Sequence, residues 1–299
     1  MLTFFIFFVI ICLNEVIMGI LYVVGTPIGN LQDMSKRAIE VLNSVDIIAC
    51  EDTRTSSVLL KHFEINKKLV SYHKFNEKTK CNSIINDLID GQNVALISDA
   101  GCPCISDPGV ILVNEAIKKE IEVIGIPGAC AFITSLMVSG MDTSSFTFYG
   151  FLDRENKKIN EKLELMKKDS SKLAIIYESP KRVLNTLEKI MATLDNPNVC
   201  LCNDLTKKFE KKYYGTASEV IKMLNSNSNA SLGEYVLIIE KKAYYKEDLK
   251  EERSTEGILI DTIKKNKCTM KDAIKIVSEE YHLPKNMDYN ASLNLKKLI

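Results

Sequence analysis

The 299-residue sequence lacks the pairings by which proteins usually bind transition metals. It has nine cysteines but no C-x-x-C motif, and its three histidines are scattered along the chain. The closest cysteines form C-x-C pairs, at Cys102/Cys104 and at Cys200/Cys202. Because a structural zinc site needs four closely grouped thiolate or imidazole ligands, we expect no metal. Reduced thiols in a cytosolic protein are the simplest interpretation.

An excess of charge of either sign is absent too. The 39 basic and 39 acidic residues cancel, so a nucleic acid partner would have to bind at a local patch. The apolar run LTFFIFFVIICL, at residues 2–13, is shorter than the ~20 residues of a membrane-spanning helix, and we expect no membrane partner. Met18 stands directly before the first predicted strand, so we expect residues 1–17 to be an upstream extension.

The standard nucleotide-binding loops are also missing. The stretch LYVVGTPIGN, residues 21–30, places an apolar strand before a turn that contains Gly25, Pro27 and Gly29. This turn matches neither G-x-G-x-x-G nor a loop ending in G-K-[ST]. A strand that runs into such a turn and then a helix is still a frequent ligand site. The pattern therefore predicts a small-molecule ligand that tolerates a proline.

Strands and helices alternate in the first part of the chain. Apolar runs predict strands at residues 20–24, 45–49, 68–72, 93–99 and 121–126. Helices are expected between them, with Asp33 as the N-cap of the first. This alternation predicts a parallel sheet that is covered by helices on both faces.

The regular alternation of predicted strands and helices ends after residue 131. A helix that ends at Gly140 is followed by predicted strands at residues 146–151, 173–179, 198–204, 211–216 and 233–240. We therefore predict an α/β protein with an N-terminal α/β domain at 18–130 and a second α/β domain, with a mixed sheet, at 131–242. A charged linker and a helical module at 255–299 complete the chain.

Polar loops follow the strands of the predicted parallel sheet. They are TPIGN after the first strand, EDTR at 51–54, SDAGCPCISDPG at 98–109 and PGACA at 127–131. The carboxyl ends of parallel strands meet at one edge of a sheet, which is where open α/β sheets bind ligands. One such loop alone would be an ordinary turn, but four at one edge predict a site.

These motifs carry a resemblance. LYVVGTPIGNLQD, EDTRTS, SDAGCPCISDPG, IPGACA, YESPKR, NDLTKKFE and GEYVLIIE, in this order, resemble the tetrapyrrole methylase superfamily and, within it, the ribosomal RNA small subunit methyltransferase I family. The resemblance covers roughly residues 20–299. It implies S-adenosylmethionine bound between two α/β domains and 2′-O-methylation of a cytidine in the decoding region of 16S rRNA. It also implies a homodimer and a C-terminal module of helix-turn-helix type.

The resemblance also implies which residues hold the cofactor. They are Pro27 in the first loop, Asp99, Ala100 and Gly101 after the fourth strand, Cys130 and Ala131 after the fifth, and Glu178 after the seventh. A sulfonium ligand needs no anion-binding loop, so a proline can stiffen the first turn.

The sequence departs from the family pattern at several positions. Cys102 and Cys104 stand where Thr and Gly are expected, and Ala129 and Cys130 where Pro and Ser are expected. A cysteine keeps the size of Thr or Ser but loses a strong hydrogen bond. Asn203 and Asp204 replace Arg and Glu, which removes a planar cation that could hold a phosphate.

The candidate catalytic residues are Glu51, Asp52 and Arg54, with Lys207 as a rival. Methyl transfer needs the ribose oxygen aligned behind the methyl group, and a general base typically adds ~10²–10⁴-fold. One carboxylate could pair with Arg54 while the other takes the proton. Lys207 could serve as the base only if desolvation lowers its pKa. Either carboxylate could instead simply cap the following helix.

Two alternatives stay open from the sequence. The chain could methylate a tetrapyrrole or a protein, or it could be a non-catalytic RNA-binding protein with the same fold. Lysines in the last segment, from Lys264 to Lys297, predict a local docking patch for rRNA phosphates.

Overall fold

The structure is a computed structural model that describes residues 18–241 and 255–280. These residues belong to two compact units, one within residues 1–242 and the other within 243–299. The upstream extension that we predict for residues 1–17 lies outside the described residues, as do the lysines beyond residue 280.

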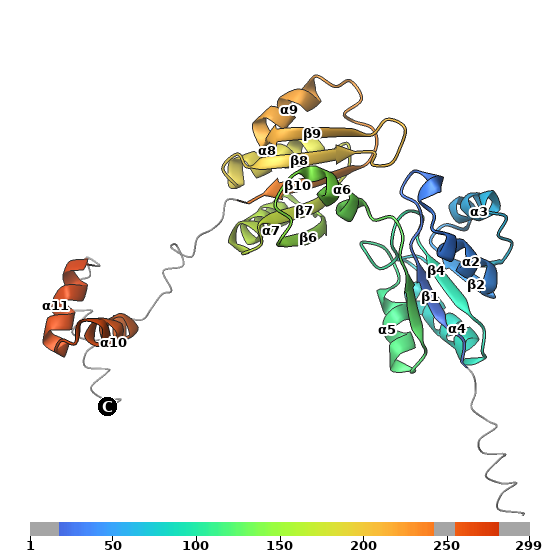
Figure 1. The fold of residues 1–299 in the computed structure, drawn as a ribbon, viewed down its shortest axis with the longest axis horizontal. Helices are drawn as coiled ribbons and strands as arrows, with labels where there is room; N and C mark the ends of the chain where they lie inside the picture. The colour runs from blue at the N-terminus through green and yellow to red at the C-terminus, as the bar shows by residue number, and fades with distance from the viewer. Residues whose placement is uncertain (1–17, 242–254, 281–299) are drawn as a thin grey trace, which may run out of the picture. The chain divides into compact units, whose positions relative to one another are not determined.

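The first sheet is parallel throughout (Figure 1). Its strands are β1 (Leu21–Val24), β2 (Ile47–Cys50), β3 (Lys68–Ser71), β4 (Val94–Ile97) and β5 (Val123–Ile126), in the order β3-β2-β4-β1-β5. Every neighbouring pair runs parallel, which confirms the sheet that the alternating pattern predicted. All five strands therefore end at one edge.

Helices cover both faces of this sheet. They are α2 (Lys36–Ser44), α3 (Thr53–His62), α4 (Glu77–Ile89) and α5 (Val110–Lys118). Along β2, Ile47 and Ala49 pack in a cluster with residues of α4 and α5, whereas Ile48 and Cys50 pack with residues of α2 and α3. Successive side chains of a strand point to opposite faces, so a fully apolar strand fits between two helical layers.

The predicted cap at Asp33 was wrong. Asp33 ends a short 3-10 turn, η1 (Leu31–Asp33), which begins where the Asn30 side chain accepts a hydrogen bond from the backbone of Gln32. Helix α2 starts at Lys36 because Ser35 is its N-cap, and the Ser35 hydroxyl accepts a 3.1 Å hydrogen bond from the N–H of Ala38.

The second sheet is mixed. Its strands are β6 (Phe146–Phe151), β7 (Leu173–Glu178), β8 (Asn198–Asn203), β9 (Lys211–Thr216) and β10 (Tyr235–Glu240), in the order β6-β7-β10-β8-β9. Strands β6 and β7 are parallel, and the remaining pairs are antiparallel. The partly antiparallel sheet predicted for this half of the chain is confirmed.

The helices of the second sheet divide between its faces. One face packs against α7 (Asn156–Lys168), α8 (Val183–Thr193) and α9 (Ala217–Asn225). The other face packs against α6 (Ala131–Ser139) and against Ile28 from the loop after β1. Helix α7 was not predicted from the sequence. It carries a narrow stripe of buried residues, Ile159, Leu163 and Met166, among lysines and glutamates.

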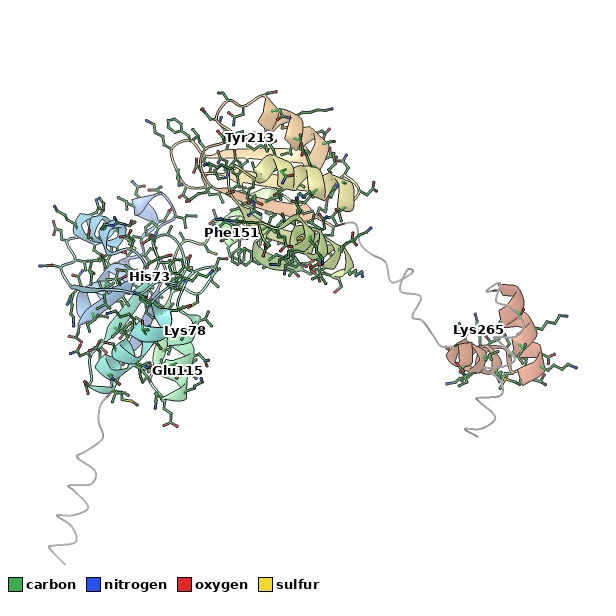
Figure 2. The ribbon with its side chains drawn as sticks, turned by 180° about the vertical axis from the view of Figure 1, so that it is seen from behind. His73, Lys78, Glu115, Phe151, Tyr213 and Lys265 are labelled. Atoms are coloured by element: carbon green, nitrogen blue, oxygen red, sulfur yellow. The ribbon has the colours of Figure 1, made fainter. Side chains whose placement is uncertain are left out.

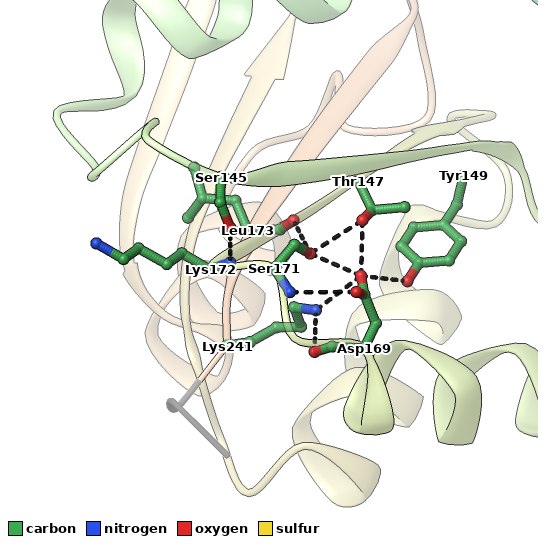
Figure 3. Close-up of polar contacts among 8 residues, drawn as sticks. All are labelled: Ser145, Thr147, Tyr149, Asp169, Ser171, Lys172, Leu173 and Lys241. Carbon is green, nitrogen blue, oxygen red and sulfur yellow. Dashed lines mark hydrogen bonds and ion pairs between the residues drawn. The ribbon is translucent and has the colours of Figure 1, made fainter. Parts of the chain in front are cut away.

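A polar network fixes the end of β10 (Figure 3). The buried Lys241 side chain donates to the carboxylate of Asp169 at 3.0 Å and to its carbonyl oxygen at 2.7 Å. The hydroxyl groups of Thr147, Tyr149 and Ser171 donate to the same carboxylate. Burial lowers the pKa of Lys241, whereas these hydrogen bonds outweigh burial and keep the pKa of Asp169 low. The charged pair therefore anchors the last strand before residue 242.

The second unit is a helix pair, α10 (Thr255–Asn266) and α11 (Met270–Glu280). Leu259, Ala273 and Val277 are buried between the two helices. The helical prediction for this segment is confirmed for the residues that are described. No helix in the described parts of the chain is long and apolar enough to cross a membrane.

Candidate functional site

A pocket of about 380 Å³ opens at the carboxyl edge of the first sheet. This volume lies within the ~300–1,000 Å³ typical of small-molecule sites. The lining residues from the first sheet's loops are Ile28, Glu51, Asp99, Ala100, Gly101, Cys102, Ile105, Ser106, Asp107, Cys130 and Ala131. The second sheet and its loops add Phe151, Tyr177, Glu178, Ser179, Pro180, Leu205, Glu234, Tyr235 and Val236. The loops after β1, β2, β4 and β5 therefore share one cavity.

Close backbone contacts hold three of these loops together. A Cβ atom on Gly128 would lie 2.6 Å from the backbone carbon of Gly25, so side chains cannot be accommodated where the β1 and β5 loops meet. Thr26 and Gly101 exchange two backbone hydrogen bonds, of 2.8 Å and 3.2 Å, which join the β1 and β4 loops. Gly101 has a φ of +82°, a conformation that favours glycine. The small residues of these motifs thus serve the close approach of the loops.

Most of the predicted cofactor-binding residues line the pocket. Asp99, Ala100, Gly101, Cys130, Ala131 and Glu178 are among its lining residues. Pro27 is buried and does not line the pocket, although its neighbour Ile28 does. Proline there fixes the turn that carries Ile28 onto the second sheet.

Glu178 is already paired within the protein. It is 2% exposed, and its carboxylate accepts 2.7 Å hydrogen bonds from the backbone of Ser179 and from the hydroxyl of Thr186. The Nε atom of Arg182 lies 3.3 Å away. Glu178 therefore holds the β7–α8 turn against the pocket, and its charge is compensated by Arg182.

Carboxyl groups dominate the polar lining. Among the described residues that line the pocket, none is lysine or arginine. Burial, and then the neighbouring Asp99, raise the pKa of Glu51. Burial, and then Glu51, raise the pKa of Asp107 to about 6. The site therefore disfavours an anion and suits a cationic ligand.

The opposite wall is aromatic and apolar. Phe151, at the end of β6 (Figure 2), and Tyr177 meet edge to face with ring centroids 5.5 Å apart. Leu205 and Val236 extend this wall. A flat ring could pack against these side chains while a cationic group faces the carboxylates.

The EDTR cluster splits in two. Glu51 lines the pocket, whereas Asp52 and Arg54 do not. Asp52 is the N-cap of α3: its Oδ1 atom accepts a 2.8 Å hydrogen bond from the backbone N–H of Arg54. The Arg54 guanidinium also lies 2.7 Å from Oδ2, and these hydrogen bonds lower the pKa of Asp52 to about 2. The side chain of Arg54 is 90% exposed.

Lys207 is held as a cation outside the pocket lining. Its Nζ atom lies 2.9 Å from Oδ1 of Asp204 and 3.0 Å from Oε2 of Glu234. Burial lowers the pKa of Lys207, but the hydrogen bonds to both carboxylates outweigh it and raise the pKa. The lowered pKa that a lysine base requires is therefore not found.

Asp107 was not predicted from the sequence, and Asn203, which replaces an expected arginine, lies outside the pocket lining. Asp107 is one of two aspartates in the β4 loop, and no sequence signal separates the half-buried Asp107 from the exposed Asp99. Asn203 is 5% exposed and donates weakly, at 3.4 Å, to the carbonyl oxygens of Leu232 and Glu234. It braces the turn before β10 and does not line the pocket.

Comparisons with known proteins agree with this architecture. Residues 20–221 match the model of the tetrapyrrole (corrin/porphyrin) methylases. The chain is 41% identical to the ribosomal RNA small subunit methyltransferase I of Haemophilus influenzae, over 92% of this chain and 96% of that protein. It is 40% identical to the protein of the same name from Bacillus subtilis, over 92% and 94% of the two chains.

Solved structures show the same fold at low identity. A diphthine synthase is similar with a TM-score of 0.58 and 13% identity, over 75% of this chain and 90% of that one. A cobalt precorrin-4 methyltransferase is similar with a TM-score of 0.54 and 12% identity, over 74% and 94% of the chains. At such identities the likeness extends to the fold alone.

Proposed function

The chain belongs to the ribosomal RNA small subunit methyltransferase I family of the tetrapyrrole methylases, and on this basis we propose that it methylates a cytidine in the decoding region of 16S rRNA. The methyl donor is S-adenosylmethionine and the acceptor is the ribose 2′-hydroxyl. The observation that carries the proposal is the acidic pocket, which four strand-end loops of the parallel sheet and one edge of the second sheet enclose.

The lining of the pocket fits this donor. S-adenosylmethionine supplies, when bound, an electrophilic methyl group on a positively charged sulfur. Asp99, Ala100, Gly101, Cys130 and Ala131 would hold it, with backbone groups and a carboxylate at one side. The aromatic wall would cover the adenine ring, and the carboxylates would favour the cation. Pro27 and Glu178 would act indirectly, because they fix the turns whose other residues line the pocket.

Glu51 is the best candidate for the general base. Asp52 is engaged as a helix cap with a pKa of about 2, and Lys207 is kept protonated by Asp204 and Glu234. Glu51 lines the pocket, and its pKa is raised, which makes its carboxylate a stronger base. Asp52 would then position Arg54, whose exposed guanidinium can contact a phosphate.

The RNA would be held by cations outside the acidic pocket. The loop between β8 and β9 carries the exposed Lys208 and Phe209, and Phe209, at 73% exposed, could stack on a base. Helix α10 contributes Lys264 and Lys265, both exposed; Lys265 is labelled in Figure 2. Such contacts would make binding salt-dependent. A homodimer belongs to the same proposal and is tested by light scattering.

A matched pair of variants tests the assignment of the base. Glu51→Gln is expected to lower methyl transfer to 30S particles by ~10²-fold or more while S-adenosylmethionine still binds in calorimetry. Glu40→Gln is the control, because it removes an exposed carboxylate on α2 that does not line the pocket. Full activity of Glu51→Gln would exclude Glu51 as the general base and leave Asp107 as the remaining candidate with a raised pKa.

A further inference from the structure

Two cysteines line the proposed cofactor pocket. Cys102 lies in the loop after β4 and Cys130 directly precedes α6, and both line the cavity. We propose that this pair is a redox modification site, at which a hydroperoxide forms a Cys102–Cys130 disulfide that blocks the cofactor and a thiol reductant restores the pocket. The blocking of the cofactor rests on the proposed function; the thiol chemistry does not.

The fold places Cys102 next to the residue that precedes Cys130. The Sγ atom of Cys102 donates to the carbonyl oxygen of Ala129 at 3.5 Å, next to Cys130 in the chain. Both side chains are half-buried and line the same cavity. The close backbone contact of Gly25 with Gly128 fixes the loop after β5, which carries Cys130, against the loop after β1. A disulfide needs Cα atoms within ~7 Å of each other, and the contact of Cys102 with the residue before Cys130 brings the two loops together at this point.

The two thiols differ in reactivity. Hydrogen bonding from Cys102 lowers the pKa of Cys130 against the effect of burial, and the N–H groups of Ile133 and Phe132 in the first turn of α6 add to it. The same interaction, together with burial, raises the pKa of Cys102. Cys130 is therefore the attacking thiolate and Cys102 the resolving thiol, the arrangement typical of redox-sensing cysteines.

The chemistry balances with one hydroperoxide per disulfide. The Cys130 thiolate attacks the peroxide oxygen, the O–O bond breaks, and a sulfenic acid and one water (an alcohol, for an organic peroxide) result after protonation. The Cys102 sulfur then attacks the sulfenic sulfur, the S–S bond forms, and the second oxygen leaves as water. The two thiols lose two electrons and two protons, and the peroxide gains them.

The disulfide would act on the proposed cofactor contacts directly. It would tie the loop of Ala100 and Gly101 to the start of α6, and it would remove an anionic sulfur from a site that suits a cation. The converse also follows: a ligand that occupies the pocket covers both thiols. Bound S-adenosylmethionine should therefore slow oxidation of the pair.

The chain contains an internal control. Cys200 and Cys202 lie on one face of β8 with their sulfur atoms 3.8 Å apart, but both residues are 0% exposed. The two sulfur atoms of this pair are close together, but an oxidant in solution cannot reach them. Cys104 offers a second control, because it is in the same loop as Cys102 and does not line the pocket.

The test treats the reduced full-length protein with hydrogen peroxide, blocks remaining thiols with N-ethylmaleimide and maps the peptides by mass spectrometry. The expected product is a Cys102–Cys130 cross-link, with Cys200 and Cys202 alkylated only after unfolding. S-adenosylmethionine affinity, measured by calorimetry, should fall at least ~10-fold and return after dithiothreitol. Added S-adenosylmethionine should slow the cross-linking.

Two variants sharpen the result. Cys104→Ser should still form the cross-link, whereas Cys102→Thr combined with Cys130→Ser should make whatever cofactor affinity remains insensitive to peroxide. The proposal is overturned if the pocket pair stays reduced while other cysteines oxidise, or if the cross-linked protein binds S-adenosylmethionine as before. Absence of binding to the reduced protein would instead count against the proposed function, and the cross-link would still decide the modification site.

Discussion

Replacing Asp107 by asparagine should stabilise the ligand-free protein at neutral pH. The carboxyl group is half-buried beside Glu51, and burial followed by that neighbour raises its pKa from 3.8 to about 6. The charged form is therefore disfavoured in the folded protein but not in the unfolded chain. Asparagine has nearly the same shape and no charge, so it removes this penalty.

The magnitude follows from the pKa difference. A shift of roughly 2 units corresponds to ~3 kcal/mol, at ~1.36 kcal/mol per unit. Because the group is only half-buried, solvent screening reduces the expected gain to ~1–2 kcal/mol. Between pH 3.8 and about 6 the folded state binds more protons than the unfolded state, so the stability of the wild type falls as the pH rises. The penalty is complete above about pH 6 and absent well below pH 3.8.

Urea unfolding of both proteins at pH 8 and pH 4 measures this effect. The variant should be more stable by ~1–2 kcal/mol at pH 8 and by only a few tenths at pH 4. Asp52→Asn is a control of opposite sign, because the pKa of Asp52 is lowered to about 2 and its charge therefore favours the folded state above pH 3.8. An equal gain for Asp107→Asn at both pH values, or a loss at pH 8, would refute the electrostatic account.

The same substitution should alter ligand preference. S-adenosylmethionine carries a sulfonium charge that S-adenosylhomocysteine lacks. Loss of the Asp107 charge should therefore weaken the first ligand more than the second, by up to ~10-fold in the ratio of affinities. Calorimetry with both ligands checks this, and an unchanged ratio would show that Asp107 does not sense the charge.

Three further outcomes are expected. Gly128→Ala should destabilise by ~1–3 kcal/mol and weaken cofactor binding, because its Cβ would lie 2.6 Å from backbone, whereas Gly125→Ala, with nothing within 4 Å, should not. Lys241→Met should destabilise by ~1–3 kcal/mol in urea unfolding, because it leaves the partly buried Asp169 carboxylate without its cation. The exposed ion pair lost in Lys172→Met should matter little. Deleting residues 256–299 should weaken binding to 30S particles in a salt-dependent way and leave cofactor affinity unchanged; equal particle binding would exclude the tail as a docking patch.

The strands were predictable because their apolar runs are buried on both faces. Strand β2, for example, has no exposed residue. A short, continuous apolar run of this kind is typical of a strand in a parallel sheet that helices cover on both faces. Helix α7 was not predicted because only three of its thirteen residues are buried, which makes its helical hydrophobic periodicity weak. The prediction of Asp33 as N-cap failed because Ser35, two residues later, can also accept a hydrogen bond from a helix N-terminus. The sequence alone does not show which of the two residues directly precedes the helix.

The candidate site was only partly within reach of the sequence. Strand-end loops could be brought to one edge by topology alone, which places Glu51 and Asp99 near each other. What each carboxylate does depends on burial and partners a few ångström away. Asp52 differs from its neighbour Glu51 because it is the N-cap of α3, whereas Glu51 lines the pocket. Cys102 and Cys130 line the same pocket from loops that are far apart in the sequence.

The most direct test of the proposed function is methyl transfer from labelled S-adenosylmethionine to isolated 30S particles, with the label mapped on the rRNA. We predict label in 16S rRNA at a single cytidine, in the decoding region, with the adjacent phosphodiester bond resistant to alkali because the 2′-oxygen is methylated. Label on a base, label on protein, or no transfer by a protein that binds S-adenosylmethionine would contradict it.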